Sequence, residues 1–185
     1  MAAETTAVSL TSSFYLNNFY RYNRNAIKTL DRKEFSTTEL SYEDTRALKR
    51  ALSKLDDFDY DNDEETSDNM LSAINAFAAT YNHTIETSSS KDSDLYRLNR
   101  QLQELSKKYE DELDDLGIRI GDDGKLNISQ DILKASTSKE LGKVFSDDSD
   151  YMRGMKHISK RMNNEAYDDV YAQLTGCGGR LNIIL

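Results

Sequence analysis

The residues best spaced for chemistry in this 185-residue chain are the acids between positions 56 and 68. Aligned with a calcium-binding loop, they would offer carboxylate ligands at alternate positions and at the twelfth: Asp57, Asp59, Asp61, Asp63 and Asp68. The sixth position, however, is Asn62 instead of the glycine that the sharp turn requires, and no glutamate closes the loop. A solvated acidic loop is therefore the favoured interpretation, and calcium binding by these five residues is the alternative.

The other side chains that could carry chemistry lack the neighbours they would need. His83 and His157 fall on different predicted helices, and neither has a cysteine or a second histidine at ligand spacing. Cys177 lies among glycines, with no nearby histidine to activate it as a nucleophile. We therefore expect no catalytic residue, no metal and no cofactor, and we predict that the protein is not an enzyme.

Composition indicates a helical chain with a large solvated surface. Proline is absent and the first of the 8 glycines is Gly117, so no strong helix breaker interrupts the first 116 residues. Eight of the 33 acids lie between positions 56 and 68, and the other 25 nearly balance the 24 bases. A surface that is acidic at one loop and nearly neutral elsewhere argues against sequence-independent binding of nucleic acid.

The sequence carries no sign of a membrane span. No apolar run approaches the ~18 residues that a span needs, and the N-terminus lacks the basic and apolar regions of a secretory signal. A single cysteine excludes an internal disulfide. We expect a soluble protein that stays in the cytoplasm or is exported without a cleaved signal.

Hydroxyl caps and apolar spacing predict two helices in the first third of the chain. Residues 1–12 are expected to form a disordered tail, and Ser12 or Ser13 to cap a helix that continues to about Leu30. After a polar connection at 31–40, Ser41 is predicted to cap a second helix that ends near residue 55.

The remaining helices carry the best-defined apolar stripes. A third helix is predicted from Ser67 or Asp68 to about residue 87, a fourth from Ser93 to Leu116, and a last one over 151–174. Their stripes form a seam for packing or for a partner: Ile74, Phe77, Tyr81, Leu95, Leu98, Leu102, Leu105, Tyr109, Leu116, Ile158, Met162 and Val170. Each leucine left in water forfeits about 1.5–3 kcal/mol. We expect the third and fourth helices to form an antiparallel hairpin, with a parallel homodimeric coiled coil as second choice.

Shorter elements follow the fourth helix. Gly117 is placed to end that helix, and the period-two alternation across 118–128 predicts a small β-hairpin. Ser129 and Thr137 are predicted to cap two short helices, and the glycine-rich segment at 176–185 to end the last helix and continue as an apolar tail. Together these elements predict an all-α fold: a single elongated antiparallel helical bundle or coiled-coil hairpin over 13–175, with one β-hairpin.

Several short segments between positions 69 and 145 occur in an order that is characteristic of one family. They are INAFAATYN (74–82), the leucine repeat at 95–105, LGI (116–118), GKLNI (124–128), DIL (131–133) and VF (144–145). In this order they resemble the C-terminal helical leg of the bacterial flagellar filament cap, also called hook-associated protein 2. The resemblance covers 77 of the 185 residues. The β-rich head domains of that family are missing, and its N-terminal glycine motif cannot precede Gly117.

The resemblance implies a structural role at the flagellum. It implies a leg that packs against terminal helices, an oligomeric cap, partners that are flagellin-like helices or further copies of the chain, and export through the flagellar type III route. Residues 13–55 would then supply the N-terminal leg. The alternative is a cytoplasmic helical adaptor or chaperone-like protein that shares only the hairpin architecture. Both hypotheses predict a non-enzymatic protein that binds partner helices through apolar stripes.

Overall fold

The computed structural model describes residues 12–28, 30–62, 66–91 and 93–176. Within these ranges the chain is mostly helical and contains one two-stranded antiparallel sheet. The predicted class, an all-α fold with one small β-hairpin, is confirmed. The predicted N-terminal tail lies outside the described residues except for Ser12, which is already helical.

The first predicted helix is shorter than expected. Residues 12–19 are helical, and two 3-10 turns follow, η1 (Arg24–Ile27) and η2 (Asp31–Glu34). The prediction of one helix to Leu30 is wrong, because the helix ends at Phe19 and the backbone turns over residues 20–23, where Asn23 adopts φ −148° and ψ 81°. This change of direction lets Phe19 and Tyr20 enter the core while Tyr22 stays on the surface.

Helix α2 (Thr37–Leu55) begins earlier than predicted. Ser36 and Glu39 form a reciprocal capping box, in which each side chain accepts from the other residue's backbone N–H. The prediction that Ser41 is the cap is wrong, because Ser41 lies one turn inside the helix. Its buried hydroxyl donates to the Thr87 carbonyl at 3.1 Å.

Helix α3 (Asp68–Thr87) begins after Ser67, as predicted, but the fourth predicted helix is divided. It forms α4 (Leu95–Lys108) and α5 (Glu110–Asp115), separated at Tyr109, where φ is −109° and ψ is 26°. The leucine spacing shifts by one position between Tyr109 and Leu113. A break at Tyr109 allows Leu113 to remain buried, and it places the Tyr109 ring 5.5 Å from that of Tyr151.

The predicted hairpin is confirmed as β1 (Ile118–Ile120) paired with β2 (Leu126–Ile128). Gly117 precedes it with φ 74°, the left-handed conformation that ends helices. Three helices follow: α6 (Gln130–Ala135), α7 (Ser138–Phe145) and α8 (Asp150–Thr175). The capping box of Thr137 and Glu140 at α7 and the end of α8 at Gly176 also agree with the sequence-based predictions.

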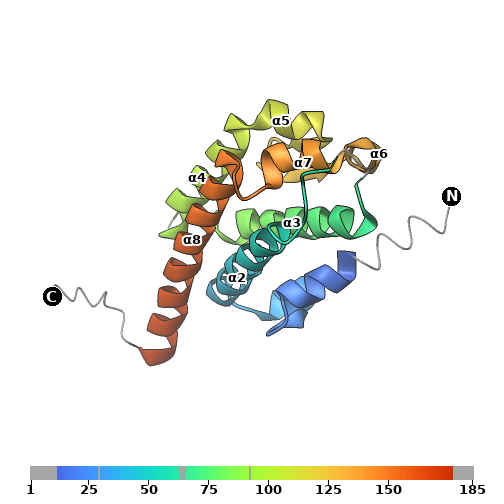
Figure 1. Ribbon diagram of the computed structural model, residues 1–185. Coiled ribbons are helices and arrows are strands. Elements are labelled where there is room, and N and C mark those ends of the chain that lie inside the picture. The colour runs from blue at the N-terminus through green and yellow to red at the C-terminus, as the bar shows by residue number, and fades with distance from the viewer. Residues whose placement is uncertain (1–11, 29, 63–65, 92, 177–185) are drawn as a thin grey trace.

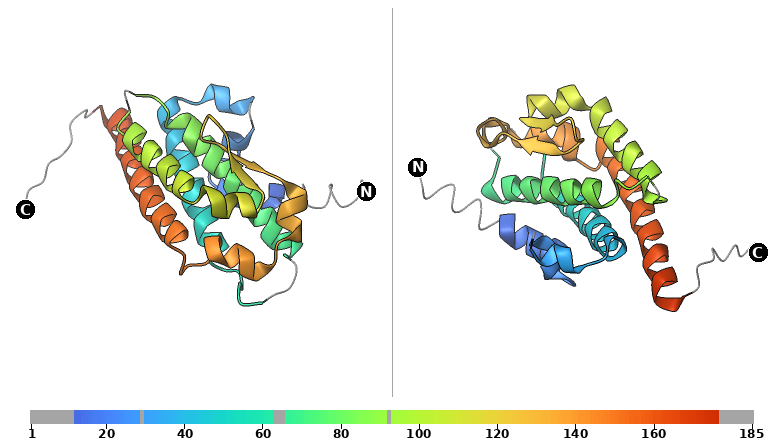
Figure 2. Two further views of the ribbon diagram at one scale, coloured as in Figure 1. Left: turned by 90° about the horizontal axis from the view of Figure 1, so that it is seen from above. Right: turned by 180° about the vertical axis from the view of Figure 1, so that it is seen from behind.

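The long helices pack in an order that the sequence did not predict. Helix α2 packs between α3 and α8, and α4 packs against α8 (Figures 1 and 2). Contacts of α2 with α8 run in opposite directions along the two helices, from Tyr42 beside Tyr167 to Asp56 paired with Lys156. The predicted hairpin of the third and fourth helices is therefore wrong as the main pairing, because α8 covers the seam of α4 and α2 covers that of α3. Rings of Phe77, Phe145 and Tyr151 meet where α3, α7 and α8 converge.

Candidate protein-interaction surface

The residues predicted to form a packing or partner seam lie almost entirely in the core. Nine of the twelve are buried: Ile74, Phe77, Tyr81, Leu95, Leu98, Leu102, Leu116, Ile158 and Met162. Leu105 and Tyr109 are half-buried and pack against the same core. Only Val170, also half-buried, lies on the C-terminal part of α8, beyond the last buried residue, Ala166. The predicted seam therefore forms part of the hydrophobic core, and a partner could bind only to a different surface of the chain.

The acidic segment is engaged in local contacts. The carboxylate of Asp57 pairs with Lys54 at 3.2 Å, and that of Asp59 accepts the Asp61 backbone N–H at 2.9 Å. Asp68 is the first residue of α3, and Asp63 lies outside the described residues. Across the described ranges, no group of three or more histidine, cysteine, aspartate or glutamate side chains is placed to hold a metal ion.

Asp44 is the centre of a buried polar cluster that sequence reasoning missed. The fully buried carboxylate accepts two hydrogen bonds from Arg32, at 2.9 and 2.8 Å. It also accepts the hydroxyls of Tyr20 at 2.7 Å and Thr87 at 3.0 Å. These contacts join the N-terminal segment, α2 and the end of α3 at one point.

His83 completes this cluster. The Tyr20 hydroxyl donates its proton to Asp44, so its oxygen accepts from Nδ1–H of His83 at 3.0 Å. Burial lowers the pKa of His83, and burial together with Asp44 raises the pKa of Tyr20 well above its usual value. Each described polar group has its partner within the cluster, which makes the cluster a structural clamp. The other two candidates are elsewhere: His157 is exposed on α8, and Cys177 lies outside the described residues.

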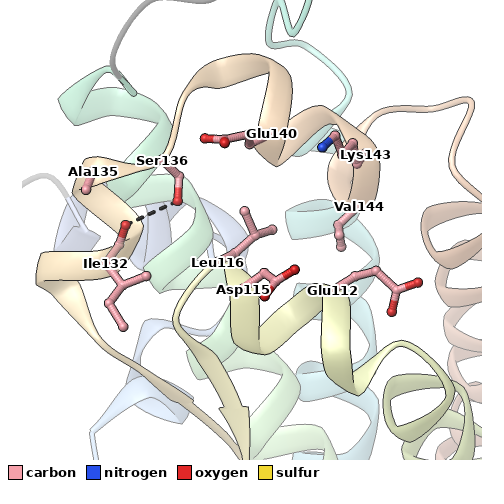
Figure 3. Close-up of a pocket in the computed structure, with 9 residues that line it drawn as sticks. All are labelled: Glu112, Asp115, Leu116, Ile132, Ala135, Ser136, Glu140, Lys143 and Val144. Carbon is pink, nitrogen blue, oxygen red and sulfur yellow. Dashed lines mark hydrogen bonds between the residues drawn. The ribbon is translucent and has the colours of Figure 1, made fainter.

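An open pocket of about 520 Å³ lies between α5, α6 and α7 (Figure 3). Buried Leu116 and Val144 form part of its wall, while Glu112 and Asp115 lie on one side and Glu140 on the other. The Glu140 carboxylate is occupied by the cap of α7, where it accepts the Thr137 backbone N–H at 2.8 Å. The other two acids of the pocket, Glu112 and Asp115, have exposed side chains. We therefore assign the pocket no chemistry.

The largest exposed apolar side chains of α8 are at its C-terminal end. Tyr167, Tyr171 and Leu174 are 52%, 55% and 81% exposed. Their spacing of four and three residues places them on one side of the helix, next to half-buried Val170. Figures 1 and 2 show this end of α8 projecting beyond the other elements. Leu174 continues the spacing of the buried stripe of α8, yet its side chain is exposed.

The two tyrosines of α8 form a row of rings with Tyr42 of α2. The rings of Tyr167 and Tyr171 are stacked with centroids 6.4 Å apart, and Tyr42 lies 5.9 Å from Tyr167. The guanidinium of Arg46 lies 5.4 Å from the Tyr42 ring and 3.9 Å from that of Tyr22. We call this row, from Tyr22 through Tyr42 to Leu174, the aromatic strip. Its α8 part could be found from the sequence by its spacing, but its junction with α2 depends on tertiary packing.

Comparisons with other proteins add no family to this description. No family model matches the chain, and neither curated proteins nor solved structures give a match. Among the described residues, no helix is long and apolar enough to cross a membrane.

Proposed function

We propose that the protein is a non-enzymatic structural or interaction protein that binds a helix of a partner along the aromatic strip. The observation that carries the proposal is the exposed row of Tyr167, Tyr171 and Leu174 on a projecting helix end. Exposed tyrosines supply large contact areas at a low cost in side-chain entropy, and they are enriched among residues that dominate binding energy. Apolar side chains at steps of three and four suit a second helix lying alongside.

The resemblance of residues 69–145 to the flagellar cap leg supports a more specific form of this proposal. In that form the chain is a headless relative of the cap leg, and its partners are flagellin-like helices or copies of itself. The segments that carry the resemblance lie on or beside α3, α4, the hairpin, α6 and α7. The alternative proposal keeps the same surface but assigns it to a cytoplasmic helical adaptor.

The partner surface can be tested with the purified full chain and monomeric flagellin. Titration calorimetry should detect binding to the wild type, and light scattering should report whether the chain also associates with itself. Replacing Tyr171 and Leu174 by serine should weaken either association at least about tenfold, because each removed anchor contributes about 1–2 kcal/mol. Gln173→Ser, on an exposed position of the same helix end, is the matched control.

The outcomes separate the two forms of the proposal. Binding to flagellin that depends on Tyr171 and Leu174 supports the flagellar form. Self-association that depends on them, without flagellin binding, supports an interaction role through copies of the chain. If both associations are absent, the flagellar form of the proposal is wrong. If an association occurs but the double variant behaves like Gln173→Ser, the aromatic strip is not the partner surface. Detection of the native protein only in the cytosol would contradict export and favour the adaptor.

A further inference from the structure

The end of the aromatic strip at Tyr22, beside α2, has a concentration of positive charge. The exposed ring of Tyr22 has three guanidiniums around it, with carbon Cζ of Arg46, Arg50 and Arg21 at 3.9, 4.7 and 5.0 Å from its centroid. The chain as a whole has a net charge of −9. A local cluster of cations on an acidic protein points to an anionic ligand.

The cluster is only partly neutralised by the chain itself. Among the described residues, Glu43 is the one carboxylate within salt-bridge distance, with Oε1 at 3.4 Å from Arg46. Its other oxygen, Oε2, is buried without a hydrogen-bond partner, and burial raises the pKa of Glu43. Glu43 is thus a poor counterion. Burial and the neighbouring positive charges of Arg46 and Arg21 lower the pKa of Arg50.

The guanidiniums of Arg46 and Arg50, both half-buried, are also held in place before any ligand arrives. Arg50 donates to the carbonyl of Phe19, and Arg21 donates to the Tyr22 hydroxyl at 3.4 Å. Arg46 lies between the Tyr22 and Tyr42 rings. Arginines that are already ordered lose less entropy on binding, and the planar guanidinium matches the geometry of a carboxylate.

We propose that Tyr22, Arg21, Arg46 and Arg50 bind the carboxylates of an acidic segment on the partner protein. The proposal rests on the proposed function: the partner helix lies along Tyr42, Tyr167 and Tyr171, and its glutamates or aspartates reach the arginines at the α2 end. Nucleic acid fits less well, because three arginines on a chain of net charge −9 offer few phosphate contacts. An acidic protein segment needs only two or three carboxylates, which this cluster can accommodate.

Three synthetic helical peptides serve as probes. They share a leucine stripe at steps of three and four and carry four glutamates, four glutamines or four lysines at one end. Fluorescence anisotropy with the full chain should give affinities in the order glutamate, glutamine, lysine, and higher salt should reduce the difference. Replacing Arg46 and Arg50 by glutamine should weaken the glutamate peptide about tenfold or more and leave the glutamine peptide unchanged.

Controls keep this result interpretable. Arg97→Gln with Arg100→Gln removes the same charge from exposed positions on α4 and should have no effect. If the loss of Arg50 unfolds the N-terminal segment, Arg21→Gln, at an exposed position, tests the same site with a smaller expected loss. Arg46→Glu with Arg50→Glu should transfer the preference to the lysine peptide.

Each outcome decides between the two proposals. Equal binding of the glutamate and glutamine peptides overturns the acidic-partner proposal and leaves the aromatic strip intact. Glutamate binding that is insensitive to Tyr171→Ser with Leu174→Ser overturns the aromatic strip and leaves the arginine site. If inorganic phosphate shifts the Tyr22 resonances while no peptide does, the site is a small-anion site and the partner proposal is wrong. Preference for a single-stranded oligonucleotide over the glutamate peptide would likewise overturn it.

Discussion

The side chain of Asn82 forms both backbone hydrogen bonds that Leu126 directs away from the hairpin. Its amide Nδ2–H donates to the Leu126 carbonyl at 2.9 Å, and its Oδ1 accepts the Leu126 N–H at 2.7 Å. Asn82 thereby takes the place of a third strand at the edge of β2 and attaches the hairpin to α3. A two-stranded hairpin is marginal alone, so this contact explains why so short a sheet is ordered.

Replacing Asn82 by alanine should release the edge of the hairpin. Two half-buried backbone groups of Leu126 would lose their partners, at a cost of about 1–3 kcal/mol. Hydrogen exchange should accelerate at the Leu126 amide and at other hairpin amides, and urea unfolding should report the loss of stability. Asn127→Ala, at an exposed position of β2, is the control. Unchanged exchange at Leu126 in Asn82→Ala would contradict the role of Asn82.

Replacing Asp44 by asparagine should destabilise the whole fold. The change leaves the Arg32 guanidinium, whose side chain is 10% exposed, without its counterion. The carboxylate accepts four hydrogen bonds, from Arg32, Tyr20 and Thr87, whereas an amide can accept only through its single oxygen. Breaking a buried pair in this way costs about 3–5 kcal/mol. Urea unfolding monitored by circular dichroism measures the effect.

The matching change at an exposed pair gives the comparison. Glu104→Gln removes the partner of Arg100, where both side chains are more than half exposed, and should cost no more than about 0.5 kcal/mol. Similar losses in Asp44→Asn and Glu104→Gln would show that burial of the Asp44 pair has little energetic weight.

Stability should fall as the pH is lowered below neutrality, in part through His83. Because burial lowers its pKa in the folded chain, the unfolded chain binds more protons between that pKa and about 6.5. The free energy of unfolding therefore decreases with falling pH in this window, by at most about 1.4 kcal/mol per pH unit for this one group.

The measurement is the free energy of unfolding from urea curves between about pH 5 and pH 7. His83→Gln removes the titrating group and should flatten the dependence, although stability at neutral pH also falls as the bond to Tyr20 is weakened. His157→Gln, at an exposed position, should keep the wild-type slope. An unchanged slope in His83→Gln would assign the pH dependence to other groups.

Gly142 marks the place where α7 meets the acidic segment. A Cβ added there would lie 2.7 Å from Cβ of Tyr60, an atom too close to the backbone to move away easily. Gly142→Ala should gain about 1 kcal/mol of helix propensity but lose about 1–3 kcal/mol through overpacking, for a net loss. In a Tyr60→Gly background, which removes that Cβ, the same change should become stabilising. Thermal unfolding of the four chains gives the coupling, and the absence of a sign reversal would contradict this contact.

Elements with local signals were predictable from the sequence. Ser67, Thr137 and Gly117 act within one turn of their own position, so the start of α3, the start of α7 and the start of the hairpin follow from neighbouring residues alone. The capping box of Ser36 and Glu39 is equally local, but the sequence-based prediction placed the cap at Ser41, whose hydroxyl instead contacts Thr87.

Features that depend on distant residues could not be predicted in this way. Asp44 reads as an ordinary charge on α2, and only the fold brings Tyr20, Arg32 and His83 to it. The leucine spacing of α4 required a cover but did not say which helix provides it. Leu174 and Met162 belong to one stripe, yet Met162 is buried and Leu174 is exposed.

The pairing of α4 with α8 has a consequence for the order in which the chain is made. A ribosome releases the leucines of α4 before α8 exists, and roughly 60 further residues, at about 5–20 residues per second, take several seconds to appear. Through that interval the nascent chain carries α4, with its leucines Leu98 and Leu102, without α8 beside it, and α2 lacks one of its two main helical neighbours. Folding of the bundle is thus completed only by its last long helix, and the growing chain is most exposed to aggregation or chaperone capture just before that helix emerges.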